Sequence, residues 1–88
     1  MATKVVVPPL GDSSDEVTIV QWHKQEGDAI ERGTILLDIE TDKAQIEVEA
    51  YGSGILRKIF VPAGRQAQVG ALLAIIAAPD EDISGLLE

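Results

Sequence analysis

The chain has 88 residues, no cysteine and a formal net charge of −8. A chain of this length forms one small core and buries only roughly 60–65% of its unfolded surface, which leaves little room for an enclosed active site. Without cysteine, disulfides, thiolate zinc sites and thiol nucleophiles are excluded. The acidic charge argues against nucleic acid as a partner, because phosphate-backbone binding needs clustered Lys and Arg. It favours docking to basic surfaces instead.

Targeting and membrane signals are missing from the sequence. No apolar run approaches the roughly 20 residues that cross a bilayer, and the N-terminus lacks a basic stretch followed by an apolar one. We therefore expect a monomeric, cytoplasmic domain that does not enter a membrane.

Alternating apolar and polar residues predict strands along most of the chain. Six are expected near residues 3–7, 17–23, 34–40, 44–50, 54–60 and 71–77. Two short extended pieces near 29–30 and 67–68 bring the total to eight.

An internal repeat appears when the sequence is shifted against itself by 37 positions. Gly27 then falls on Gly64 and Gly33 on Gly70. Apolar residues also coincide: Ile19 with Leu56, Trp22 with Ile59, Leu36 with Leu73 and Ile39 with Ile76. Two copies are too few for a solenoid but suit two small sheets that cover each other's apolar faces. The repeat predicts an all-β flattened barrel or sandwich with internal pseudo-twofold symmetry.

The expected strands 34–40 and 44–50 form a hairpin with Asp42 and Lys43 as its central turn residues. Opposing positions then sum to 85, and every facing pair on one side is apolar: Ile39 with Ile46, Leu37 with Val48 and Ile35 with Ala50. This register exposes Lys43 at the tip. Because the turn has Asp-Lys rather than Asn-Gly or Asp-Gly, we expect a type I-like turn.

The segment Glu40-Thr41-Asp42-Lys43-Ala44 between such strands resembles the lipoyl-attachment motif of lipoyl domains. Those domains belong to the dihydrolipoamide acyltransferases of 2-oxo acid dehydrogenase complexes. The resemblance extends to Pro9-Leu10-Gly11, Ile19, Trp22, Gly27-Asp28, Gly33, Leu36, Gly54-Ile55, Gly64, Val69-Gly70 and Ile75. One departure is Ala50-Tyr51, where the family usually has proline after Ala or Ser.

The resemblance implies two four-stranded sheets and a carrier that is not itself catalytic. Lys43 would hold covalent lipoate as a swinging arm, which carries acyl groups and electrons between active sites. The implied partners are a thiamine-diphosphate-dependent 2-oxo acid decarboxylase, dihydrolipoamide dehydrogenase, and a lipoate–protein ligase or lipoyl transferase. Glu40, Thr41, Asp42 and Ala44 would form the recognition surface, with Leu10 to Asp15 as a second candidate.

The domain is expected to span residues 1–78. Residues 79–88 are acidic and break the alternation, so we expect them to begin an interdomain linker.

Two other readings share the fold. A biotinyl carrier domain would bracket its lysine with methionines, whereas here the neighbours are Asp42 and Ala44. An unmodified interaction module, such as the lipoyl-like domains of membrane-fusion adaptors, usually has a helical hairpin inserted at this turn. A glycine-cleavage carrier would be longer.

The remaining polar residues favour structural roles. A metal site among Glu40, Asp42, Glu47 and Glu49 is disfavoured, because Glu47 and Glu49 share a solvent face and no Asp-x-Asp-x-Asp-Gly loop is present. His23 is the single histidine, and we expect it to pack on an edge strand.

Overall fold

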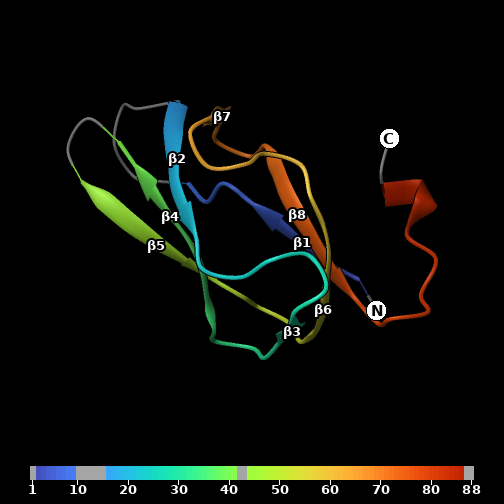
Figure 1. Cartoon of the computed structure of the whole chain (residues 1–88). Coiled ribbons are helices and arrows are strands. Elements are labelled where there is room, and N and C mark those ends of the chain that lie inside the picture. Colours follow the sequence, from blue (N-terminus) through green and yellow to red (C-terminus); the bar gives the residue numbers. More distant parts are fainter. Residues whose placement is uncertain (1, 10–15, 42–43, 87–88) are drawn as a thin grey trace.

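The computed structural model describes residues 2–9, 16–41 and 44–86 and shows eight strands and one short 3₁₀ helix (Figure 1). The strands are β1 Thr3–Val6, β2 Glu16–Trp22, β3 Ala29–Ile30, β4 Ile35–Glu40, β5 Gln45–Glu49, β6 Gly54–Ile59, β7 Gln66–Gln68 and β8 Leu72–Ala77; the helix, η1, is Ser84–Leu86. All eight predicted strands are confirmed, with ends that differ by no more than one residue. Within the described ranges, no helix is long and apolar enough to span a bilayer.

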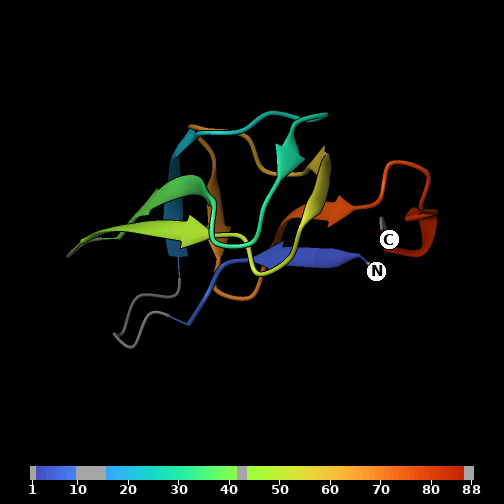
Figure 2. The same ribbon diagram turned by 90° about the horizontal axis from the view of Figure 1, so that it is seen from below.

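The strands form two antiparallel four-stranded sheets. We call the sheet with the order β1-β8-β6-β3 sheet A and the sheet with the order β5-β4-β2-β7 sheet B. Seen from below, β1 (blue) begins and β8 (orange) ends on the side of the two chain ends, and the β4–β5 hairpin (green) lies on the opposite side (Figure 2). This arrangement confirms the predicted all-β class and sheet count.

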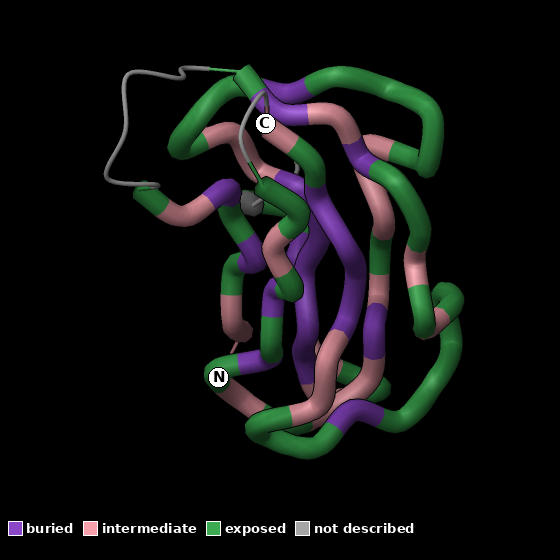
Figure 3. The backbone as a smooth tube through the Cα atoms, turned by 90° about the vertical axis from the view of Figure 1, so that its left-hand side faces the viewer, coloured by how far each residue is buried: buried purple, intermediate pink, exposed green. Residues whose placement is uncertain are grey.

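One apolar core fills the space between the two sheets, and the buried stretches of both follow its length (Figure 3). Its largest fully buried side chains include Ile19, Leu36, Leu37, Ile39, Leu56, Leu73 and Ile76. Trp22 is half-buried against this cluster, and its indole Nε1 donates a hydrogen bond to the Val61 carbonyl at 2.9 Å. Both sheets therefore depend on the same core.

The predicted pseudo-twofold symmetry extends to individual hydrogen bonds. The Gly27 amide donates to the Leu56 carbonyl at 2.8 Å, and the Gly64 amide donates to the Ile19 carbonyl at 2.7 Å. Ile19 and Leu56 are themselves related by the same shift of 37. The φ angles of Gly27 and Gly64 are 96° and 91°, a region that glycine enters at little steric cost.

The N-terminal strand takes the place in sheet A that β5 has in sheet B. In sheet B, Ile39 of β4 pairs with Ile46 of β5, and in sheet A the equivalent Ile76 of β8 pairs with Thr3 of β1. The position beside β8 is therefore already filled by β1. In sheet B, β5 follows β4 in the chain and pairs with it. The segment that follows β8 cannot pair with β8 in the same way, because β1 occupies that position.

One detail of the predicted hairpin register is wrong. The pairs Ile39 with Ile46 and Leu37 with Val48 are confirmed, but Ile35 pairs with Glu49 rather than Ala50. The register shifts between Ile35 and Leu37. Ala50 instead exchanges backbone hydrogen bonds with the preceding turn, accepting from Gly33 and donating to Thr34, both at 2.8 Å.

The molecule measures 39 × 25 × 21 Å, with the β4–β5 hairpin and the two chain ends on opposite sides (Figure 1). After β8 the chain turns at Ala78 and lies against the outside of sheet A, where Ile83 is buried. The domain boundary after residue 78 remains a prediction.

Candidate functional site

Three hydrogen bonds between Thr41 and Ala44 close the ends of the β4–β5 hairpin. The Thr41 amide donates to the Ala44 carbonyl at 2.8 Å. The Thr41 hydroxyl oxygen accepts from the Ala44 amide at 3.1 Å and lies 3.2 Å from the Ala44 carbonyl, to which its proton is donated. Only two residues, Asp42 and Lys43, connect these ends, as the sequence predicts. Both lie outside the described residues, and so does the predicted type I-like turn.

Of the predicted recognition residues, the structure brings Glu40, Thr41 and Ala44 together at this end of sheet B. Glu40 and Ala44 are exposed, as is Gln45, which pairs with Glu40 across the strands. Thr41 is half-buried, and its hydroxyl is hydrogen-bonded to the Ala44 backbone. The second candidate surface, Leu10 to Asp15, lies outside the described residues.

Charge is divided between the two sheets. The strands of sheet B carry acidic residues and no Lys or Arg, whereas those of sheet A carry basic residues and no Asp or Glu. The acidic residues are Glu16, Asp38, Glu40, Glu47 and Glu49, and the basic ones are Lys4, Arg57 and Lys58. The hairpin therefore belongs to the acidic side of the molecule, which favours encounter with basic surfaces.

A contact between the buried Asp38 and the exposed His23 on sheet B was not predicted from the sequence. Asp38 points away from the core on β4, yet its exposed fraction is only 9%. Its Oδ2 lies 3.1 Å from His23 Nε2, and its Oδ1 has no hydrogen-bond partner among the described residues. The repeat offers a signal, because residue 75, the equivalent of Asp38, is a buried isoleucine.

The expected edge-strand role of His23 is wrong. His23 follows β2, which lies between β4 and β7 inside sheet B, and its amide donates to the Leu36 carbonyl at 2.8 Å. Its side chain covers Asp38 from the solvent side. Alternation alone does not reveal this role, because it depends on which strand lies next to β2.

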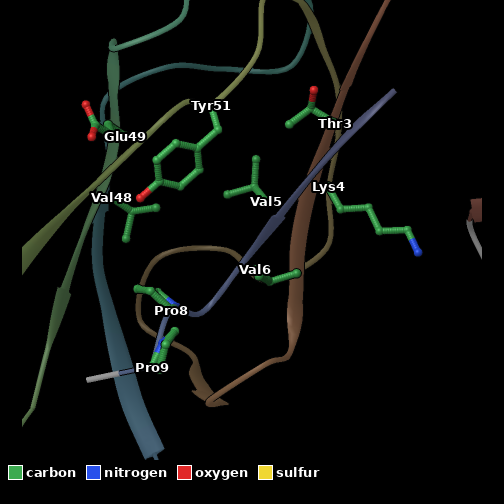
Figure 4. Close-up of a pocket in the computed structure, with 9 residues that line it drawn as sticks. All are labelled: Thr3, Lys4, Val5, Val6, Pro8, Pro9, Val48, Glu49 and Tyr51. Carbon is green, nitrogen blue, oxygen red and sulfur yellow. The ribbon is translucent and has the colours of Figure 1, made fainter. Parts of the chain in front are cut away.

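An open, mainly apolar pocket of about 200 Å³ lies between β1 and the end of β5 (Figure 4). Val5, Val6, Pro8, Pro9 and Val48 line it together with Thr3, Lys4, Glu49 and Tyr51. Lys4 and Glu49 point to different sides, so they do not form a charged pair there (Figure 4). Tyr51, which replaces the proline expected from the resemblance, is 70% exposed at the rim.

Comparison with known proteins assigns the chain and its fold to a family. The biotin/lipoyl family model, described as "Biotin-requiring enzyme", matches residues 3–76. A dihydrolipoyllysine-residue acetyltransferase component of pyruvate dehydrogenase complex from Rickettsia bellii is 40% identical over 100% of this chain and 21% of its own length. A dihydrolipoyllysine-residue succinyltransferase component of 2-oxoglutarate dehydrogenase complex from Bacillus subtilis is 42% identical over 84% of this chain and 18% of its own. The chain therefore spans about a fifth of the length of these relatives.

Solved structures agree with the sequence relatives. The lipoyl domain of the 2-oxoglutarate dehydrogenase complex from Azotobacter vinelandii has a TM-score of 0.71 and 32% identity, covering 84% of this chain and 94% of that one. A urea carboxylase from Kluyveromyces lactis has a TM-score of 0.73 and 25% identity, covering 88% of this chain and 6% of that one. The chain belongs to the biotin/lipoyl family and, within it, to the lipoyl domains of 2-oxo acid dehydrogenase acyltransferases.

Proposed function

We propose that Lys43 carries covalently attached lipoate and that this domain presents it as a swinging arm. The observation that carries the proposal is the hairpin closed by Thr41 and Ala44, which leaves only Asp42 and Lys43 as the connection. The relatives named after a dihydrolipoyllysine residue support the same function. The flanks Asp42 and Ala44 differ from the methionines of biotinyl carriers.

The described side of the hairpin fits a long covalent group. Glu40, Ala44 and Gln45 are all exposed, so the described residues beside the connection lie at the solvent surface. When attached, lipoate would supply a disulfide ring that accepts two electrons as its S–S bond opens, after which one of the two sulfurs can hold an acyl group. From bonds of about 1.5 Å, the lysine and lipoyl chain together reach roughly 14 Å beyond the backbone.

The described residues next to the attachment point hold the two strand ends together. The Thr41 hydroxyl fixes the distance between the strand ends, because it binds both the amide and the carbonyl of Ala44. Glu40, Glu47 and Glu49 give this side of the domain a negative potential, which steers basic partner surfaces toward it.

The partners follow from the larger protein that the relatives represent. We assign to the domain a thiamine-diphosphate-dependent 2-oxo acid decarboxylase as acyl donor and dihydrolipoamide dehydrogenase as electron acceptor. A lipoate–protein ligase or lipoyl transferase would modify Lys43. A flexible tether would keep the arm near these active sites at an effective concentration on the order of millimolar.

Intact-mass spectrometry tests the proposal. The domain is incubated with lipoate, ATP and a lipoate–protein ligase, and in parallel with biotin, ATP and a biotin ligase. We expect a single lipoyl increment on the wild type and on Lys58→Ala, an exposed lysine on sheet A, but none on Lys43→Ala. An increment that persists in Lys43→Ala, or no increment on folded wild type, contradicts the proposal. A biotin increment alone indicates a biotinyl carrier instead.

A further inference from the structure

The segment after β8 covers an apolar patch on the outer face of sheet A. Ile75 and Ala77 of β8 point away from the central core, yet both are 0% exposed, and Ile83 packs on them with an exposed fraction of only 9%. Phe60 and Leu72 border the same cluster. This second cluster is separate from the core between the sheets.

Hydrogen bonds hold the segment in its place. Arg57 of β6 donates from Nη1 to the Ala78 carbonyl at 2.5 Å and to the Glu81 carbonyl at 2.9 Å. The Glu81 amide donates back to the Ala78 carbonyl at 3.1 Å, and Glu81 Oε1 accepts from the Ala78 amide at 3.2 Å. The Asp82 carboxylate accepts the Ser84 amide at 2.9 Å. The segment therefore has a defined turn, two hydrogen bonds from Arg57 of sheet A and a capped 3₁₀ helix.

The pseudo-symmetry explains why only sheet A needs such a cover. The equivalents of Ile75 and Phe60 in sheet B are Asp38 and His23, which form a polar pair. The equivalent of Arg57 is Val20, which cannot bind carbonyl groups. The outer face of the second half is therefore apolar at its centre and carries a guanidinium beside it, two features that the first half lacks.

Charge complements the apolar contact. Lys4 of β1 and Lys58 of β6 both pair with Ile75, so they lie on either side of it on the same face. In Figure 4 the Lys4 side chain points away from the pocket residues Val48 and Tyr51. The covering segment contains Asp80, Glu81 and Asp82 immediately before Ile83. An acidic segment with an aliphatic anchor thus meets a basic face with an aliphatic centre.

We propose that the outer face of sheet A is a docking surface for an acidic segment with an aliphatic anchor, and that residues 79–86 of the same chain occupy it. The folded domain then ends after residue 86 rather than after residue 78, and any flexible tether begins there. Eight flexible residues would span about 15 Å, from roughly 5–6 Å multiplied by the square root of their number. When the segment is docked, the tether loses this flexible length and starts on the side opposite the β4–β5 hairpin.

Backbone ¹⁵N relaxation of the full 88-residue chain tests the docking. We expect order parameters of about 0.85 for residues 80–85 in the wild type, equal to those of the strands, and values below about 0.6 in Ile83→Asp and Arg57→Ala. Val69→Asp and Arg32→Ala are the matched controls, since both side chains are exposed outside the segment and sheet A. Order parameters below about 0.6 for this segment in the wild type overturn the proposal.

A second measurement identifies the occupant. Methyl NOE cross-peaks between Ile83 and Ile75 are recorded in a sample that mixes differently labelled chains. We expect the cross-peaks to arise within one chain. Light scattering should give the mass of a monomer. Intermolecular cross-peaks would assign the surface to the tail of a second copy and overturn the intramolecular docking. Because neither readout depends on Lys43, failure here leaves the carrier proposal untouched.

Discussion

At the scale of single residues, Asp38 and His23 show how the two halves use different chemistry for one task. Each half has an outward-facing residue at the middle of one strand, β4 or β8. The residue that follows the adjacent strand, β2 or β6, lies against it. In sheet B this pair is Asp38 with His23, and in sheet A it is Ile75 with Phe60. The Asp38 carboxylate has no hydrogen-bond partner for Oδ1 among the described residues, and we expect the polar pair to stabilise its half less than the apolar pair does, because burying a carboxylate carries a desolvation cost.

Removing the partner of Asp38 should therefore be costly. We expect His23→Ala to lower the free energy of unfolding by about 1–3 kcal/mol, because the Asp38 carboxylate loses the imidazole that contacts its Oδ2. The double variant Asp38→Ile, His23→Phe removes the carboxylate together with its partner and should be more stable than His23→Ala, although no described segment covers the new apolar pair as Ile83 covers Ile75. Urea unfolding followed by far-UV circular dichroism measures both, and a double variant less stable than His23→Ala would refute the comparison.

The hairpin register is predictable from the sequence because apolar residues recur at every second position in both strands, at Leu37 and Ile39 and at Ile46 and Val48. The third predicted pair fails because an irregularity beside Ile35 cannot be read from alternation. The burial of Asp38 is not predictable in this way either. It depends on tertiary cover by a residue from another strand, which local periodicity does not encode.

At the scale of elements, the turns that frame the short strands β3 and β7 are the most regular part of the repeat. Gly27, Gly33, Gly64 and Gly70 have φ angles between 87° and 96°, and an added Cβ at any of them meets nothing within 4 Å. The loss of stability when one of these glycines is replaced by alanine is therefore set by backbone conformation alone. Gly54 differs, because a Cβ there would lie 2.9 Å from the Ala77 carbonyl oxygen.

Alanine substitutions should separate these two causes. We expect Gly27→Ala and Gly64→Ala to destabilise the domain by similar amounts of about 1–2 kcal/mol, because each forces the same left-handed conformation. Gly54→Ala should cost more, since the backbone of β8 must also move. Gly85→Ala is the control, with open space and no strained φ. Thermal unfolding of the four variants provides the measurement, and unequal costs for Gly27 and Gly64 would contradict the symmetry argument.

The cap of η1 should respond to acid. The backbone and side-chain hydrogen bonds from Ser84 lower the pKa of Asp82 below its ordinary value of 3.8. Because the folded-state pKa is the lower one, the cap contributes stability above pH 3.8 and loses it as the pH falls through the folded value. A ¹³C titration of the carboxyl group should show this pKa. Ser84→Ala keeps only the backbone bond and should move the pKa partly back, whereas an unshifted wild-type value would contradict the cap.

At the scale of the whole molecule, the two sheets are parts of one cooperative unit. Leu36 in sheet B and Leu73 in sheet A are related by the repeat, and both are fully buried in the core between the sheets. Neither sheet keeps an apolar interior without the other. The eight strands and the symmetry are predictable from the repeat. The segment that covers Ile75 is not, because the acidic residues 80–82 are also typical of a linker.

We expect Leu36→Ala and Leu73→Ala each to lower the free energy of unfolding by about 2–5 kcal/mol. The difference between the two variants should be smaller than the loss in either one. Unfolding should remain a single transition, with Trp22 fluorescence and far-UV circular dichroism giving the same midpoint. Val69→Ala, at an exposed position, should stay within about 0.5 kcal/mol of the wild type. Separate midpoints for the two probes would show that one sheet melts before the other.

The place of β1 beside β8 makes the chain suitable for circular permutation. Thr3 pairs with Ile76 as Ile46 pairs with Ile39, so the start of β1 and the end of β8 are as close as the two ends of a hairpin. A two-residue turn that joins them, with new termini opened in the link between β5 and β6, would keep every strand pairing. If that turn were Asp-Lys between Thr and Ala, the permuted domain would present an attachment hairpin at the end opposite the natural one.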